Sequence, residues 1–367
     1  MTSPAARVSA VAKPAAPAVQ RLRVDENGAG QRLDNYLVTL LKGVPKTHVY
    51  RVIRSGEVRV NKGRAGADTR LALGDELRIP PVRVADRSAV PAAPAREFPI
   101  VYEDDFLLAI DKPAGVAVHG GSGVSSGVIE QLRQARPQAK FLELVHRLDK
   151  ETSGLLLIAK KRSALVALQE QLRQRETGKT YTALVFGAWP AERKVIDVAL
   201  HKYLTPQGER RVHAVAADDG AGRRSITLVR IARQFRLAAA APGASGSTAT
   251  RAATPSKRTS SACERLDAGC YTLLDVTIKT GRTHQIRVHL TNEGHAIVGD
   301  EKYGDFALNK AVARGDAVPG ARFERMFLHA RRLRFTHPGS AAVIELESPL
   351  PAECEALIHA LTRADPP

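Results

Sequence analysis

Hydrophobic residues near the start of the chain recur first at helical and then at strand spacing. Two segments repeat apolar residues every three to four positions, which predicts two short helices, the first of them ended by Gly43. Two alternating runs follow and predict strands. Residues 21–84 are therefore predicted to form a small separate module. The helical positions are Leu33, Leu37, Leu40, Leu41, Val49, Val52 and Ile53, and the strand runs are 57–61 and 71–80.

The pattern changes beyond residue 98, where apolar runs of strand length follow one another. A helical pattern over 163–174 lies between two of these runs. Because strands and helices do not alternate regularly, the sequence predicts an α+β domain over 98–365 with a mixed, mainly antiparallel β-sheet. The apolar runs are LLAID, GLLLIA, TYTALVFG, YTLLDVTI and VIELE.

Three stretches have the composition of low-complexity sequence. Residues 1–20 are rich in alanine and proline, and we expect a disordered tail there. The alternatives for this tail are a basic arm that contacts RNA and an organelle-targeting presequence. Residues 85–97 are predicted to be a Pro/Ala linker between two domains. Residues 236–268 are expected to form a disordered insertion in a surface loop of the second domain.

The charge of the chain favours a polyanionic partner. Lysine and arginine number 55 against 38 aspartates and glutamates, which gives a formal net charge of +17. Cationic side chains that bind a nucleic acid release its condensed counterions, so nucleic acid is the expected partner. The longest apolar run, LLLIA at 155–159, is too short to span a bilayer, and the N-terminus lacks the pattern of a secretory signal. We therefore expect no membrane association.

Cysteine and histidine do not form the patterns of a disulfide framework or a metal site. The cysteines at 263, 270 and 354 include no C-x-x-C pair, which is typical of a reduced, cytoplasmic protein. Eleven histidines include no H-E-x-x-H pattern, and His284 and His289 are five positions apart. We expect no metal ion.

A run of cations follows the first predicted helix. Six cations between positions 46 and 64 face a single acid, Glu57, whereas most charge runs are simply solvated surfaces. Here the run lies on a helix–turn–helix–strand unit, and the segments RLDNYL, VPKTHVYRVIRSGEVRVNK and GDELRIPP resemble the S4 RNA-binding module. The resemblance implies contacts to phosphates, which position RNA and carry little sequence information. The cations assigned to RNA binding are Lys46, Arg51, Arg54, Arg59 and Lys62.

Three polar clusters flanked by apolar runs are candidates for chemistry. They occupy 102–121, 145–161 and 271–290. The second contains Arg147 and Asp149 in a charged loop that precedes a buried strand. In the third cluster the pattern predicts a helix that starts at Thr283 and presents His284 and Arg287 on one face. Each cluster alone fits a surface ion pair, the commoner role of such residues; their order along the chain favours a site.

Together these clusters resemble a known family. HRLDKETSG at 146–154 resembles the active-site signature of the RluA-type pseudouridine synthases, which isomerise uridine in RNA. DKPAG at 111–115, KTYTALVFG at 179–187 and GRTHQIRVH at 281–289 resemble the other motifs of this family. The resemblance runs from about residue 21 to the C-terminus, with the S4-like module ahead of the catalytic motifs.

The resemblance also implies roles for individual residues. Asp149 is the expected catalytic carboxylate, and it can act by attack at C1′, by addition to the uracil ring or by deprotonation of the sugar. Arg287 is its expected charge partner, and Tyr181 is expected to stack on the flipped uracil or relay the C5 proton, with a core tyrosine as the alternative. Arg147 is expected to fill the space that the uridine vacates or to hold the backbone. Arg282 and His284 are assigned to RNA contacts.

The expected substrate is large-subunit (23S) rRNA or a large-subunit assembly intermediate, and three uridines near the peptidyl-transferase centre are the targets that the resemblance implies. Because the reaction exchanges no electron, phosphate or carried group, no cofactor is expected. We expect a monomer. The alternatives are a related synthase for another rRNA or tRNA site, and a non-catalytic RNA-binding factor of ribosome assembly.

Overall fold

The computed structural model divides into two compact units, Met1–Ala92 and Ala93–Pro367, and each is described by itself. Most of the three low-complexity stretches lie outside the described residues. These are residues 1–17 of the expected tail, residues 85–92 of the expected linker and residues 238–268 of the expected insertion. The structure describes residues 18–41, 43–82, 93–121, 126–206, 208–216, 218–237 and 269–366.

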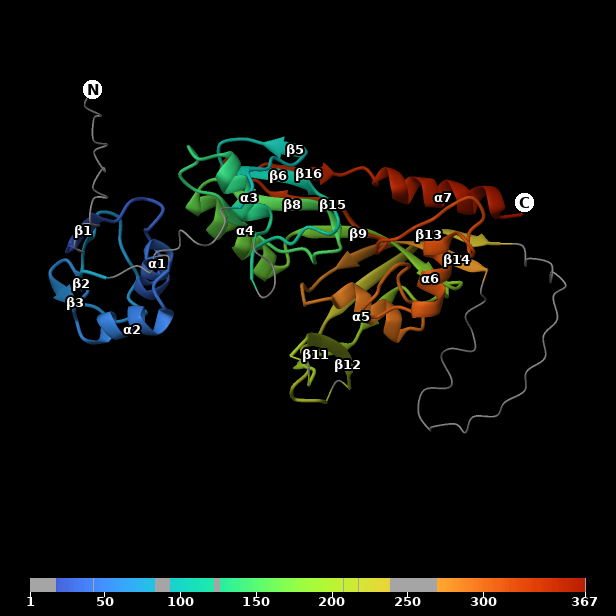
Figure 1. Cartoon of the computed structure of the whole chain (residues 1–367), viewed down its shortest axis with the longest axis horizontal. Helices are drawn as coiled ribbons and strands as arrows, with labels where there is room; N and C mark the ends of the chain where they lie inside the picture. Colours follow the sequence, from blue (N-terminus) through green and yellow to red (C-terminus); the bar gives the residue numbers. More distant parts are fainter. Residues whose placement is uncertain are drawn as a thin grey trace, which may run out of the picture. The chain divides into compact units, whose positions relative to one another are not determined.

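The first unit packs two short helices against a small antiparallel sheet (Figure 1). In the described residues this sheet has four strands in the order β1-β4-β2-β3. The predicted apolar positions form its core, except that Leu40 is 40% exposed. Helix α1 ends at Leu40, and its cap residue Leu41 leaves the helical conformation and takes the core position instead. The elements are β1 (Gln20–Arg23), α1 (Leu33–Leu40), α2 (Lys46–Arg54), β2 (Arg59–Val60), β3 (Gly63–Arg64) and β4 (Glu76–Ile79).

The cations predicted to bind RNA occupy two places in this unit. Lys46, Arg51 and Arg54 are exposed on α2, whose other face is buried. Strands β2 and β3 are joined by Asn61 and Lys62, both with positive φ (49° and 68°), which is the backbone of a type I′ hairpin turn. Lys62 therefore lies at the exposed tip of this hairpin.

The second unit is built on one large sheet. In the described residues it has ten strands, ordered β10-β13-β14-β9-β15-β8-β6-β5, with β16 added beside β15 and β7 beside β8. All pairs are antiparallel except β8 with β15, so the predicted α+β class with a mixed, mainly antiparallel sheet is confirmed. The strands are β5 (Ile100–Glu103), β6 (Leu107–Lys112), β7 (Glu143–Leu144), β8 (Ser153–Ala159), β9 (Gly178–Phe186), β10 (Val195–Asp197), β13 (Ile226–Arg236), β14 (Cys270–Ile278), β15 (Leu328–Thr336) and β16 (Val343–Glu347).

Helices cover the sheet and bury it on two faces. The alternating side chains of β8 enter two different clusters, Leu156 and Ile158 the larger one and Leu155 and Leu157 the smaller. This burial on both faces explains the continuous apolar run of β8. Figure 1 shows α7 running along the sheet near β13. Across the described ranges, no helix combines the length and apolarity needed to cross a bilayer. The helices are α3 (Val128–Ala135), α4 (Arg162–Gln174), α5 (Gln285–Asn292), α6 (Phe306–Arg314) and α7 (Ala352–Ala364).

A separate hairpin follows β10 and was not predicted. Its strands β11 (Ala199–Leu204) and β12 (Arg210–Val215) pair only with each other among the named strands of the described residues. Leu200 and Val212 pack against Val288 of α5, which fixes the hairpin beside that helix.

The buried side chain of Lys112 holds the loop between β7 and β8. Lys112, at the end of β6, is completely buried, and its Nζ donates to the carbonyls of Pro113 (2.8 Å), Val116 (2.8 Å) and Lys150 (3.0 Å). In the protonated form of Lys112, its three N–H bonds meet three acceptors. Burial lowers the pKa of Lys112 to about 7. This group ties the turn after β6 to the loop that precedes β8.

We expect Lys112→Met to lower the free energy of unfolding by about 3 kcal/mol, because three backbone carbonyls lose their donor. Urea unfolding followed by the fluorescence of Trp189, the single tryptophan, measures the change in this unit. Lys310→Met, an exposed surface change, is the control and should shift the value by less than about 0.5 kcal/mol. Equal stability of both variants would contradict this account of the loop.

Gly154 lies at the parallel junction of the sheet, paired with Ala330, and has a φ of 106°. A Cβ at this position would clash with the backbone of Ala330. We therefore expect Gly154→Ala to destabilise the second unit by about 3 kcal/mol, from backbone strain and overpacking together. The same urea titration tests this. Gly220→Ala, where a Cβ meets open space, should be neutral, and a similar loss there would remove the argument.

Candidate active site

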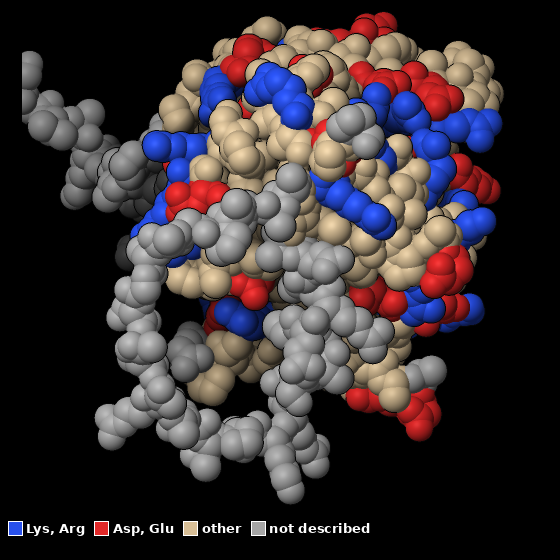
Figure 2. All heavy atoms as spheres, turned by 90° about the vertical axis from the view of Figure 1, so that its right-hand side faces the viewer, with Lys and Arg blue, Asp and Glu red and all other residues tan. Residues whose placement is uncertain are grey.

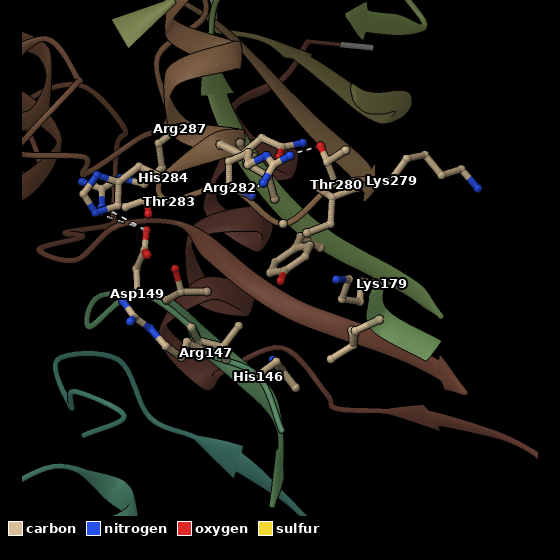
Figure 3. Close-up of a pocket in the computed structure, with 18 of the residues that line it drawn as sticks. His146, Arg147, Asp149, Lys179, Lys279, Thr280, Arg282, Thr283, His284 and Arg287 are labelled. Carbon is tan, nitrogen blue, oxygen red and sulfur yellow. Dashed lines mark hydrogen bonds and ion pairs between the residues drawn. The ribbon is translucent and has the colours of Figure 1, made fainter. Parts of the chain in front are cut away.

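Asp149 lies in the loop between β7 and β8, and its carboxylate faces two groups near the N-terminal end of α5. Its Oδ2 is 3.3 Å from Nη1 of Arg287 and 3.8 Å from Nε2 of His284. The Asp149 side chain retains 26% exposure, whereas that of Arg287 retains 7%. Figure 3 shows the carboxylate pointing toward His284 and Arg287. The structure thus brings together residues from the second and third sequence clusters.

The orientation of Arg287 is fixed by a second, fully buried carboxylate. Its Nε and Nη2 donate to the two oxygens of Asp300 at 2.7 and 2.8 Å. Asp300 Oδ1 also accepts the backbone N–H groups of Lys302 (2.9 Å) and Tyr303 (3.0 Å). Burial alone would raise the pKa of Asp300, but the guanidinium and these N–H groups outweigh it and hold the pKa below its ordinary value. Nη1 of this planar fork contacts Asp149.

The turn before α5 differs from the prediction. The helix begins at Gln285, not at Thr283, and His284 is its N-cap with a left-handed backbone (φ 52°). The Gln285 side chain accepts from Thr280 Oγ1 (2.8 Å) and donates to Thr227 Oγ1 (3.0 Å), and these bonds hold the turn against β13. His284 and Arg287 still reach one carboxylate, because the N-cap turn redirects the imidazole toward Asp149.

Tyr181 lines the same cavity as Asp149 and Arg287. It lies on β9, between β14 and β15, and is only 8% exposed. Burial first, and then the nearby Asp149 carboxylate, raise the pKa of Tyr181 above its ordinary value, so the phenol keeps its proton at neutral pH. Nearby, burial and then Lys179 lower the pKa of His146 to about 3, and His146 Nε2 accepts the backbone N–H of Leu157 at 3.1 Å. This wall is therefore neutral apart from Lys179.

These side chains line a cavity of about 890 Å³ with an unusual balance of charge. Nine lysines and arginines and one carboxylate, Asp149, are found among its described lining residues. By contrast, the face in Figure 2 shows cations and anions interspersed. A second cavity of about 510 Å³ shares Asp149 and its neighbours, so the carboxylate lies where the two cavities meet. The nine cations are Arg147, Arg173, Arg175, Lys179, Lys202, Arg210, Lys279, Arg282 and Arg287.

The candidate residues of the catalytic motifs gather in this cavity. Asp149, Tyr181, Arg287, Arg147, Arg282 and His284 all line it. Arg147 is exposed and lies in the walls of both cavities. The candidates Lys46, Arg51, Arg54, Arg59 and Lys62 belong to the first unit. No group of three or more potential metal ligands occurs in the part of the chain that the structure describes.

Several residues of the site were missed by the sequence reasoning. Asp300 and Tyr303 lie in the polar segment HAIVGDEKYGD, which follows the third cluster and has the same strand-to-turn character. Lys202 and Arg210 come from the hairpin, whose signal was two alternating runs around TPQG. Lys112 was inside a recognised motif, but nothing in a sequence reports that a lysine is buried.

Family models match both units of the chain. The model of the RNA pseudouridylate synthase family matches residues 106–292, and the S4 domain model matches residues 31–77. A solved structure titled human RNA pseudouridylate synthase domain containing 4 has a TM-score of 0.51 and 23% identity, and the match covers 72% of this chain and 93% of that one. At this identity the likeness concerns the fold alone.

Curated relatives match nearly end to end. Ribosomal large subunit pseudouridine synthase C of Salmonella typhimurium is 42% identical over 354 residues, which cover 95% of this chain and 98% of that protein. The protein of the same name from Escherichia coli is 43% identical over 340 residues, 91% of this chain and 94% of that one. The resemblances to the S4 module and to the synthases are thereby confirmed, and the chain belongs to the RNA pseudouridylate synthase family.

Proposed function

We propose that this protein converts specific uridines of large-subunit (23S) rRNA to pseudouridine, with Asp149 as the catalytic carboxylate. The observation that carries the proposal is the single carboxylate set among nine cations, with its position defined by a guanidinium that a buried second carboxylate orients. The names of the curated relatives support the choice of large-subunit rRNA. The cytoplasm, where rRNA is made and assembled, is the proposed place of action, and a monomer the proposed active form.

The chemistry requires a carboxylate, a pocket for a detached base and a means to hold the RNA. Asp149 acts on the ribose or the uracil ring while Arg287 balances its charge. The phenol of Tyr181, on the cavity wall, stacks on the uracil, and it can relay the C5 proton if its own hydroxyl proton passes to the nearby Asp149 carboxylate. No electron, phosphate or other group is exchanged in this isomerisation.

The cations of the cavity would hold the phosphates on both sides of the flipped uridine. Arg147 lies at the junction of the two cavities, where a strand that continues past Asp149 would cross. It is therefore the proposed wedge or backbone contact, and flipping a base costs a few kcal/mol that such contacts offset. Arg282 and His284 complete the RNA-facing wall. The α2 cations and Lys62 of the S4 domain are proposed to position the RNA through its phosphates.

We expect Asp149→Asn to reduce pseudouridine formation by about a thousandfold or more, because an amide is neither a nucleophile nor a base, while RNA affinity changes little. The measurement is a pseudouridine map of large-subunit rRNA from a deletion strain that expresses either variant, beside filter binding of the purified proteins. Asp197→Asn, which breaks an exposed ion pair with Arg224, is the matched control and should keep full modification. Wild-type yield from Asp149→Asn would refute the assignment. Unmodified rRNA in the wild type would instead favour a non-catalytic assembly factor.

We expect Arg287→Lys to lower kcat by about a hundredfold with a small change in KM. A lysine cannot give two bonds to Asp300 and a third to Asp149, so the charge would no longer be held in place. Steady-state kinetics on an rRNA fragment test this. Arg193→Lys removes an equivalent two-bond pair with Glu293 (2.7 Å for each bond) outside the cavity and should leave kcat unchanged. An Arg287→Lys variant with normal turnover would remove the proposed role.

A further inference from the structure

Tyr303 is part of the site but has no role in the function proposed above. It follows Asp300, to which its backbone N–H donates, and its ring lies under the Arg287 guanidinium with Cζ 5.0 Å from the ring centroid. Its hydroxyl has two partners. The backbone N–H of Val212, on β12, reaches it at 3.1 Å, and Nδ1 of His284 lies 2.7 Å from it. Tyr303 thus connects the hairpin to the imidazole that faces Asp149.

The directions of these hydrogen bonds follow from the atoms involved. The Val212 N–H can only donate, so the Tyr303 oxygen accepts it. The phenol keeps its own proton, and Nδ1 of His284 accepts this proton in the tautomer whose hydrogen is on Nε2. In this tautomer the hydrogen of His284 is on Nε2, the nitrogen that faces Asp149 Oδ2 at 3.8 Å. Since a carboxylate only accepts, this is the tautomer that the whole chain of contacts favours.

The surroundings of His284 keep it neutral and in place. Its backbone is the left-handed N-cap of α5, and its ring packs edge-on against the Tyr303 ring with centroids 5.4 Å apart. Burial is the main cause that lowers the pKa of His284. Asp149 and Asp300 oppose this effect, whereas Arg287 and Lys302 add to it. A neutral imidazole carries one N–H hydrogen. The hydrogen-bond partner of Nδ1 therefore decides which of the two nitrogens carries this hydrogen.

Both donors near Asp149 address the same oxygen. The hydrogen bond from Arg287 Nη1 and the contact from His284 Nε2 both go to Oδ2. Within the described residues, no hydrogen bond or ion pair reaches Oδ1 of this carboxylate. Oδ1 is therefore the oxygen open to a substrate.

We propose that Tyr303 is a positioning residue for the reaction: its hydroxyl fixes the Nε2–H tautomer of His284, so that an N–H faces Oδ2 of Asp149 while Arg287 binds that oxygen and Oδ1 is left for the uridine. The proposal rests on the isomerase function proposed above. It also makes the hairpin strand β12 part of the support of the carboxylate, since the Val212 N–H holds the Tyr303 hydroxyl in place.

The tautomer is tested directly by nitrogen-15 NMR of histidine-labelled full-length protein, with the His284 signals assigned by substitution. We expect a protonated Nε2 and an unprotonated Nδ1 in the wild type, and a mixture of tautomers in Tyr303→Phe. A protonated Nδ1 in the wild type would overturn the proposal. This result does not depend on activity, so it stands apart from the question of whether the protein modifies rRNA.

Kinetics test the consequence for the reaction. We expect Tyr303→Phe to lower kcat on a large-subunit rRNA fragment by about tenfold, the effect of one lost hydrogen bond, with KM within about twofold. Tyr203→Phe, the same deletion on the neighbouring hairpin strand, should change neither. The double variant separates the two roles. In His284→Gln the amide nitrogen donates a hydrogen near the position of Nε2, and an amide has no second tautomer for Tyr303 to exclude. Tyr303→Phe should therefore lower kcat no further in this background. An equal tenfold loss in both backgrounds, or a change confined to KM, would show a merely structural role. A wild type without pseudouridine activity would refute the proposed function, whereas the NMR result would still decide the contact.

Discussion

The guanidinium of Arg287 is shared between two carboxylates that differ in exposure. Asp300 is fully buried and takes two of its N–H groups, while Asp149 retains access to the cavity and takes a third. An unpaired charge would be costly at the buried position of Arg287 or of Asp300. The ion pair between them therefore allows the guanidinium to be buried. Asp300, not Asp149, therefore orients the guanidinium that contacts Asp149. The N-cap turn at His284 and the turn after Asp300 are both arranged around this fork.

The loop that carries Asp149 has a corresponding support on its other side. Lys112 holds this loop through the carbonyl of Lys150, the residue after Asp149, while Gly154 lets β8 enter the only parallel pairing of the described sheet. The carboxylate and its cation therefore come from segments next to two different strands of one sheet, since Asp149 precedes β8 and the helix with Arg287 follows β14. Catalytic groups held in this way lose little orientation when the substrate binds.

The sequence was informative where local pattern and motif coincide. The strands β6, β8, β9 and β14 were predicted from their apolar runs, and Asp149, Tyr181 and Arg287 from motifs that surround them. The helix start was wrong by two residues because Thr283 resembles an N-cap, whereas the Gln285 hydrogen bonds place the cap at His284. Contacts between distant segments could not be predicted: the pairing of Arg287 with Asp300, and the bridge from Val212 through Tyr303, depend on how the hairpin folds back on α5. The burial of Lys112 likewise depends on contacts between distant segments and could not be predicted from the sequence.

The cation-lined cavity also carries a cost for the protein when no RNA is bound. Like charges gathered around one carboxylate repel each other, and this repulsion opposes folding of the unit that contains them. A substitution that neutralises one of them would be expected to make the fold more robust while it weakens the grip on the substrate. The charge of this cavity therefore acts on stability and on substrate binding in opposite directions, and a bound polyanion would neutralise the repulsion.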